Sequence, residues 1–146
     1  MLKLFIQTVL NRVDVVLLSD SVMLMAESWP SNKDEVKRLL PAIELMLKKA
    51  GYEWREIGQI LVVVGKGNFS ATRIGVTIAN TIMLATGAQI FEMELPEHSE
   101  AGEISLKDIL NQAEAVFAGG KNVELAKPIY RSEPMISLSK KKKFTE

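Results

Sequence analysis

The chain has 146 residues and a mass of 16.2 kDa, which is the size of one domain with its own hydrophobic core. Hydrophobic residues make up 47% and charged residues 25%, which is typical of a folded globular protein and excludes a collagen-like or disordered chain. The sequence has no cysteine and a single histidine, His98, so it predicts no disulfide, no thiol nucleophile and no Cys/His metal site.

Charge is balanced over the whole chain, with 18 basic and 18 acidic residues. Four of the cations form the run 140–143, and without residues 140–146 the chain carries 14 basic and 17 acidic residues, a net charge of −3. This acidic body argues against a dedicated nucleic-acid surface, because such surfaces gather Lys and Arg on one face. We expect contact with RNA to be weak or absent, and residues 140–146 to form a disordered basic tail.

No segment predicts a signal peptide or a membrane span. The apolar residues 1–10 are followed by charged residues and by no small-residue cleavage site. Residues 74–91 carry no charge, but glycine, threonine, asparagine and glutamine dilute the stretch. We therefore expect a cytoplasmic protein.

The first thirty residues predict three antiparallel strands. Residues 2–9 and 13–19 are apolar and rich in β-branched side chains, and Asn11-Arg12 between them forms a turn. Residues 22–27 follow a second turn at Asp20-Ser21 as the third strand.

A helix over residues 33–50 is predicted next, because apolar residues recur at the i, i+3, i+4, i+7 spacing of an amphipathic helix. Asn32 is the expected N-cap, with Glu35 at the capping-box position, and Gly51 ends the helix. Pro41 lies inside it and is expected to introduce a kink.

The middle of the chain predicts two parallel crossovers. Residues 60–64 are continuously apolar and mostly β-branched, as in a strand that is buried on both faces, and we expect this strand to be the central parallel one. Ser70 caps a helix over residues 71–86 that Gly87 ends, and residues 88–95 form another strand. The order β-β-β-α-β-α-β predicts an α/β fold with a mixed five-stranded sheet, three antiparallel strands plus parallel crossovers, and helices packed on it.

The remaining chain has a weaker pattern. Residues 105–113 predict one short helix, residues 115–118 a short strand, and the chain from Gly119 onward mostly irregular structure. His98 is expected to be an exposed loop residue.

Residues 65–75, with the sequence GKGNFSATRIG, join the buried strand to the next helix. Backbone N–H groups and the helix dipole at such a junction favour an anion, so a phosphate site is one interpretation. The other, which we favour, is a tight turn whose glycines permit positive φ, because Lys66 lacks the Walker spacing. Arg73 is either an anion clamp or a residue that holds the loop through its carbonyls, and we favour the second.

The pattern of a β-branched strand followed by Gly-x-Gly-x-Phe-Ser-x-x-Arg-Ile-Gly resembles the signature of the TsaB family, GPGSFTGLRIG. These proteins take part in the synthesis of threonylcarbamoyladenosine in bacterial tRNA. Residues 37–43 and 128–131 also resemble family segments, the first including the proline inside its helix. The matching motif-loop residues are Gly65, Gly67, Phe69, Arg73 and Gly75, together with Ile74 and, as a near match, Ser70.

The resemblance implies a single lobe of the actin-like/RNase H-like fold of the sugar kinase superfamily. Residues 1–95 would form the TsaB-like N-terminal lobe and residues 96–139 a remnant C-terminal segment packed on it, because the chain has no length for the second lobe. We therefore expect a reduced, one-lobe member of the family.

The resemblance also bears on catalysis. Family members usually carry Asp-Thr-Ser in the first strand, where the aspartate of this superfamily helps to hold a metal-nucleotide, and here the residues are Gln7-Thr8-Val9. The catalytic paralogue TsaD binds metal through two histidines, and this chain has only His98. The implied protein is an inactive paralogue of the threonylcarbamoyltransferase, with no catalytic residues, cofactor or metal.

The helix of residues 71–86 has an apolar surface over more than half of its circumference, which exceeds what one sheet covers. Either the helix of residues 33–50 in the same chain covers the rest, or another subunit does. The resemblance favours a subunit contact, with a TsaD-like protein or as a homodimer through both helices. The residues that we expect at this interface are Leu39, Ile43, Leu47, Val76, Ala79 and Met83.

Three functions are weighed on these observations. The favoured one is a scaffold that binds a TsaD-like enzyme through the two helices and supports tRNA modification. The alternatives are a small nucleotide-binding enzyme that uses the loop of residues 65–70, and an RNA-binding accessory protein that uses the lysine tail.

Overall fold

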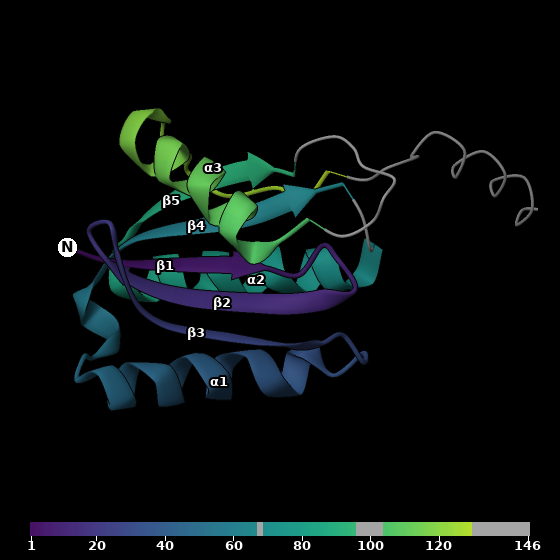
Figure 1. Ribbon diagram of the computed structural model, residues 1–146, viewed down its shortest axis with the longest axis horizontal. Coiled ribbons are helices and arrows are strands. Elements are labelled where there is room, and N and C mark those ends of the chain that lie inside the picture. Colours follow the sequence, from purple (N-terminus) through teal and green to yellow (C-terminus); the bar gives the residue numbers. More distant parts are fainter. Residues whose placement is uncertain (67–68, 96–103, 130–146) are drawn as a thin grey trace, which may run out of the picture.

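The computed structural model describes residues 1–66, 69–95 and 104–129, with the side chain of Phe69 excepted. Figure 1 shows a sheet between two layers of helices. In chain order the elements are β1 (Leu2–Gln7), β2 (Arg12–Ser19), β3 (Val22–Pro30), α1 (Glu35–Ala50), η1 (Trp54–Glu56), β4 (Ile57–Gly65), α2 (Phe69–Thr86), β5 (Gln89–Glu94) and α3 (Leu106–Gly119).

The five strands form one mixed sheet in the order β3-β2-β1-β4-β5. β1 pairs antiparallel with β2, and β2 with β3, whereas β4 runs parallel to both β1 and β5. The predicted fold class is therefore confirmed. β4 is the central one of the three parallel strands β1, β4 and β5, as expected, whereas β1 is the middle strand of the whole sheet.

The two faces of the sheet have separate hydrophobic cores. α1 and α2 cover one face and α3 covers the other (Figure 1). Alternate residues of β4 supply both cores: Ile60, Val62 and Val64 face α1 and α2, while Leu61 and Val63 face α3. This double burial explains the continuous apolar run that predicted the strand.

The start of α1 differs from the expected one. Lys33 has a φ of 64°, in the left-handed region, so the helix begins only at Glu35. Asp34 occupies the N-cap without a side-chain cap bond, and the Glu35 carboxylate instead accepts a hydrogen bond from Ser31 Oγ. The predicted cap at Asn32 was therefore wrong, whereas Gly51 ends α1 with a φ of 84°, as expected.

The other two helices also differ from the predictions. α2 begins at Phe69, so Ser70 lies inside its first turn rather than at the cap. Residues 115–118 belong to α3 and not to a strand, because the apolar spacing of Ile109, Ala113 and Phe117 continues one helical face into the core. Ser105 caps α3 and accepts a hydrogen bond from the Asp108 N–H at 3.1 Å.

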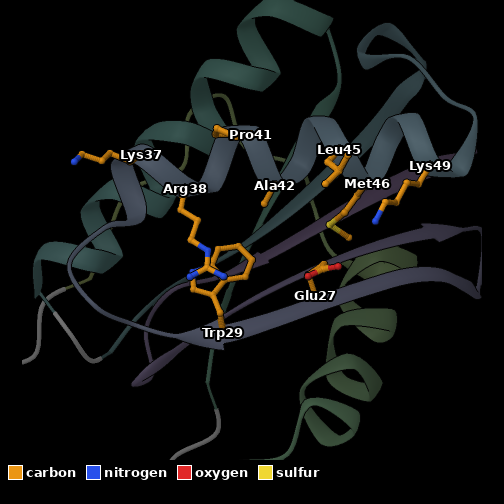
Figure 2. A pocket seen from close by; sticks show the side chains of 9 residues that line it. All are labelled: Glu27, Trp29, Lys37, Arg38, Pro41, Ala42, Leu45, Met46 and Lys49. Carbon is orange, nitrogen blue, oxygen red and sulfur yellow. The ribbon is translucent and has the colours of Figure 1, made fainter.

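α1 lies beside the edge strand β3, and a groove runs between them (Figure 2). Along the other edge of the sheet, the segment of residues 121–129 passes over β5: the Val123 N–H donates to the Ile90 carbonyl at 2.8 Å. The Asn80 side chain of α2 holds the same segment through two hydrogen bonds to Ala126. It donates to the Ala126 carbonyl at 2.9 Å and accepts from the Ala126 N–H at 2.8 Å.

No helix in the described ranges has the length and apolar character that crossing a membrane requires. His98 and residues 140–146 lie outside the described residues. The domain boundaries proposed at residues 95 and 139 also fall at or within such segments and stay predictions.

Candidate functional site

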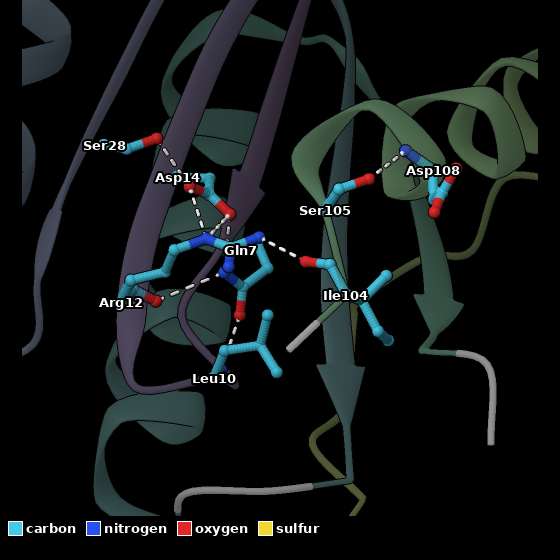
Figure 3. A network of polar contacts seen from close by, with 8 residues as sticks. All are labelled: Gln7, Leu10, Arg12, Asp14, Ser28, Ile104, Ser105 and Asp108. Carbon is cyan, nitrogen blue, oxygen red and sulfur yellow. Dashed lines mark hydrogen bonds and ion pairs between the residues drawn. The ribbon is translucent and has the colours of Figure 1, made fainter. Parts of the chain in front are cut away.

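A row of polar side chains crosses three adjacent strands where β1 ends (Figure 3). Gln7 is the last residue of β1, and the strand registers place Asp14 of β2 beside it and Ser28 of β3 beside Asp14. The Gln7 amide donates to Asp14 Oδ2 at 2.9 Å, and Ser28 Oγ donates to Asp14 Oδ1 at 2.6 Å. Gln7 and Asp14 are both fully buried.

Arg12 neutralises the buried carboxylate in this row. Its Nε lies 3.0 Å from Asp14 Oδ2, and its Nη2 donates to the Ile104 carbonyl at 2.7 Å, just before α3. The Gln7 side-chain oxygen accepts from the Leu10 N–H at 2.7 Å. The row therefore joins the turn after β1, the strand β2 and the start of α3 into one hydrogen-bonded unit.

The residues at the end of β1 do not fit a divalent cation. Gln7 directs an amide N–H toward Asp14, and the Arg12 guanidinium lies on the same carboxylate, so a metal would meet donors and a positive charge. No cluster of His, Asp or Glu that could hold a metal occurs in the described part of the chain. The arrangement neutralises the charge of Asp14 and links three adjacent strands.

Gly65, the first motif-loop residue, ends β4 and lies directly against the C-terminal segment. A Cβ at this position would lie 2.6 Å from the Ile129 carbonyl oxygen. The Ile129 N–H donates to the Val64 carbonyl at 2.6 Å, and the Leu95 N–H donates to the Gly65 carbonyl at 3.0 Å. Gly65 is therefore required for the close approach of three chain segments at the end of β4.

Gly75 serves a second close approach, between α2 and the end of β1. A Cβ on Gly75 would lie 2.9 Å from Thr8 Cγ2 and still closer to Thr8 Oγ1. Thr8 is buried, and its hydroxyl donates to the Ala71 carbonyl at 2.7 Å. The last glycine of the motif thus allows α2 to pack on the first strand.

Gly75→Ala is expected to lower the free energy of unfolding by about 1–3 kcal/mol, because the methyl group would overpack the contact with Thr8. Gly119→Ala is the control, since a Cβ there meets nothing within 4 Å in the last turn of α3. It should be neutral or stabilise by up to about 1 kcal/mol. Urea unfolding measures both, and equal stability of the two variants would contradict the contact.

The remaining motif-loop residues are only partly described. Gly67 lies outside the described residues, as does the side chain of Phe69. Ser70 and Arg73 are exposed in the first turns of α2 and line a groove of about 420 Å³ together with Val36 of α1. The two interpretations of Arg73 stay predictions.

The predicted interface residues lie in the core of this chain. All except Met83 are at most 2% exposed, and Ala79, Leu39 and Ile43 are completely buried between the helices and the sheet. A side chain without exposed surface cannot contact a partner, so the choice of these five residues is corrected, whereas Met83 is partly buried and stays a prediction. The reason is that one apolar stripe of each helix packs on the sheet, and the spacing alone does not say which stripe does so.

The exposed side of the two helices carries a different set of residues. Val36 and Leu40 of α1 are 67% and 38% exposed, and Leu84 of α2 is 73% exposed. A second groove of about 420 Å³ lies between the helices near Leu40 and Thr81. We call this side the helical surface; it consists of Val36, Leu40, Ile74, Thr77, Thr81, Leu84 and Ala85.

Sequence reasoning missed the helical surface and the roles of Arg12, Asp14 and Ser28. The alignment of the two predicted hairpins across residues 7, 14 and 28 could have indicated the polar row, since cross-strand neighbours share a face. The helical surface had only the mixed apolar and polar spacing of Thr77, Thr81 and Leu84 as a signal.

Comparison with known proteins identifies the architecture. No protein-family model matches the sequence, and no curated protein matches it either. Among solved structures, YeaZ from Pseudomonas aeruginosa superposes with a TM-score of 0.60 at 22% identity, over 64% of this chain and 43% of that chain. This chain has the YeaZ fold. It spans less than half of the length of that YeaZ structure.

Two further structures share the architecture. An uncharacterized protein with similarity to the peptidase YeaZ from Pseudomonas aeruginosa gives a TM-score of 0.73 at 16% identity, covering 88% of this chain and 98% of that one. RuvC from T. thermophilus, in complex with a Holliday junction substrate, gives a TM-score of 0.54 at 12% identity, covering 84% of this chain and 99% of that one. The fold is therefore the actin-like/RNase H-like one that the motif resemblance implied.

Proposed function

We propose that this protein is a non-catalytic partner of a TsaD-like enzyme and supports the threonylcarbamoyladenosine modification of tRNA in the cytoplasm. The proposal rests on the fold of YeaZ, also called TsaB, together with the polar row at the end of β1. At this position the resemblance implies a catalytic carboxylate, but Gln7 occupies it, and Gln7 and Arg12 both contact Asp14. These contacts leave no free acid at the end of β1, which supports the proposal that a partner supplies the chemistry.

The partner contact is proposed on the helical surface. Its exposed apolar side chains, including Val36, Leu40 and Leu84, would lose contact with water when a partner packs on them. In the absence of the enzyme we propose that two copies pair through the same surface. A partner bound there can change the activity of the enzyme only if it contacts the active conformation better than the inactive one.

Reconstitution tests the proposal. The cognate TsaD-like enzyme is assayed for threonylcarbamoyl transfer to tRNA with and without this protein. We expect no transfer by this protein alone and a clear stimulation of the enzyme. Thr81→Glu, which places a charge on the helical surface, should reduce the affinity for the enzyme at least tenfold, or about 1.4 kcal/mol.

Asn111→Glu is the matched control, because it adds the same charge at an exposed position of α3, on the other face of the sheet. It should stimulate the enzyme like the unchanged protein. Equal transfer with and without this protein would refute the partner role, and transfer by this protein alone would refute its non-catalytic character. Light scattering of the free protein should show a dimer that Thr81→Glu separates.

The nucleotide-binding alternative has no comparable support. Among the described residues of that loop, Gly65 is in contact with Ile129 and Lys66 lies 3.9 Å from Glu94. Neither contact favours a nucleotide.

A further inference from the structure

β3 is an edge strand with exposed apolar residues near its start. Its outer side pairs with no other strand in the described part of the chain. Val22, Met23 and Leu24 are 63%, 52% and 37% exposed, which is high for consecutive apolar residues. Unpaired N–H and C=O groups on such an edge form a template for one more strand.

The groove between β3 and α1 continues this edge (Figure 2). It has a volume of about 380 Å³, and Trp29 of β3 lines it together with Pro41, Leu45 and Met46 of α1. In Figure 2 the side chains of Trp29 and Met46 lie between the strand and the helix. A strand added to β3 would direct every second side chain toward this apolar lining, because side chains alternate between the two faces of a sheet.

The charges around the groove are mostly positive. Lys37, Arg38 and Lys49 line it with Glu27 as the single carboxylate, although the chain without its tail carries a net charge of −3. Within the described residues Lys37 and Lys49 make no ion pair, and Arg38 lies 3.9 Å from Asp34. An occupant with carboxylates near the two ends of the groove would therefore be electrostatically complementary.

Trp29 supplies an independent sign of a missing partner. Its side chain is 5% exposed, and the Arg38 guanidinium stacks 4.6 Å above its ring. The indole N–H has no hydrogen-bond acceptor in the described part of the chain. Buried Trp N–H groups usually have an acceptor, and a strand added at this edge would bring carbonyl and carboxylate oxygens close to it.

We propose that β3 and the groove beside it bind an extended, acidic segment of a partner protein, which adds to the sheet as a sixth strand. The strand and the helix that border the groove have similar lengths, because the nine residues of β3 extend about 30 Å and the 16 residues of α1 about 24 Å. A second copy of this chain fits less well, because it would bring another Lys37, Arg38 and Lys49 to the same place. The surface lies on the opposite side of α1 from the helical surface, so the inference does not depend on the proposed function.

A defined peptide tests the inference. The probe is a fluorescein-labelled nine-residue peptide with threonine at the five odd positions. Its four even positions are, in order, glutamate, leucine, leucine and glutamate. One comparison peptide has lysine in place of both glutamates, and another has proline in place of the three inner threonines, which prevents ladder hydrogen bonds. By fluorescence anisotropy at low salt, we expect the acidic peptide to bind at least tenfold more tightly than either comparison peptide.

Adjacent lysines of α1 provide matched variants. Lys49 lines the groove, whereas Lys48 lines a different surface near Tyr52. Lys49→Glu should weaken binding of the acidic peptide at least tenfold and strengthen that of the lysine peptide, while Lys48→Glu should change neither more than twofold. Hydrogen exchange should show slower exchange of alternate β3 amides when the acidic peptide is bound.

Three results would overturn the inference. The first is equal binding of the acidic and proline-containing peptides, and the second is an equal effect of the two lysine variants. The third is self-association of the protein that Leu24→Lys abolishes while Thr81→Glu leaves it intact, since the occupant of β3 would then be a second copy. Circular dichroism establishes that each variant is folded before its binding is compared.

Discussion

Ala79→Glu is expected to unfold the protein. Ala79 is completely buried in the hydrophobic core where α2 packs on the sheet. Burying an unpaired carboxylate costs several kcal/mol, and a domain of this size has a total stability of about 5–15 kcal/mol. Urea unfolding followed by circular dichroism should show the loss of most or all of the native transition.

Thr81→Glu is the matched control for this prediction, since residue 81 is exposed on the same helix. Its free energy of unfolding should stay within about 0.5 kcal/mol of the unchanged protein, because the new carboxylate stays in water. A stable Ala79→Glu variant that merely separates subunits would show that Ala79 faces a partner, and the packing of α2 on the sheet would then be wrong.

Arg12→Ala is expected to lower the free energy of unfolding by about 3 kcal/mol. The Asp14 carboxylate is completely buried and would lose its neutralising guanidinium, leaving only the neutral donors Gln7 and Ser28. Breaking a buried ion pair costs about 3–5 kcal/mol, and the two remaining donors place this case at the lower end. Thermal and urea unfolding both measure the change.

Two further variants show whether burial is the cause. Arg55 and Glu53 form a pair at the same 3.0 Å distance, but their side chains are 81% and 65% exposed. Arg55→Ala should therefore lower the stability by less than about 1 kcal/mol. Asp14→Asn in the Arg12→Ala background should restore part of the loss by removing the unpaired charge, and a further loss would contradict the assignment.

The sheet was predictable because its signals are local. The connections at residues 8–11 and 20–21 separate apolar runs that have no other way to bury themselves, and the apolar run in β4 required cover on both faces. The glycines that end α1 and α2 were equally clear, because a positive φ there favours glycine over every other residue.

The candidate site was less predictable because it depends on which side of an element faces inward. α2 has apolar residues on most of its circumference, so Val76 and Ala79 could be assigned to a partner as easily as to the sheet. Asp14 could be seen as an acid near a turn, but its neutralisation by Arg12 depends on strand register and burial, which the sequence pattern did not provide.

The bidentate contact of Asn80 with the backbone of Ala126 has a consequence for aggregation. By holding residues 121–129 along β5, it covers part of one sheet edge, where Val123 bonds to Ile90. Fibrils grow by strand addition when both edges of a sheet accept new strands. With the β5 edge obstructed, copies of this chain can pair edge to edge only through β3, so such pairing ends at two copies and does not continue into a polymer.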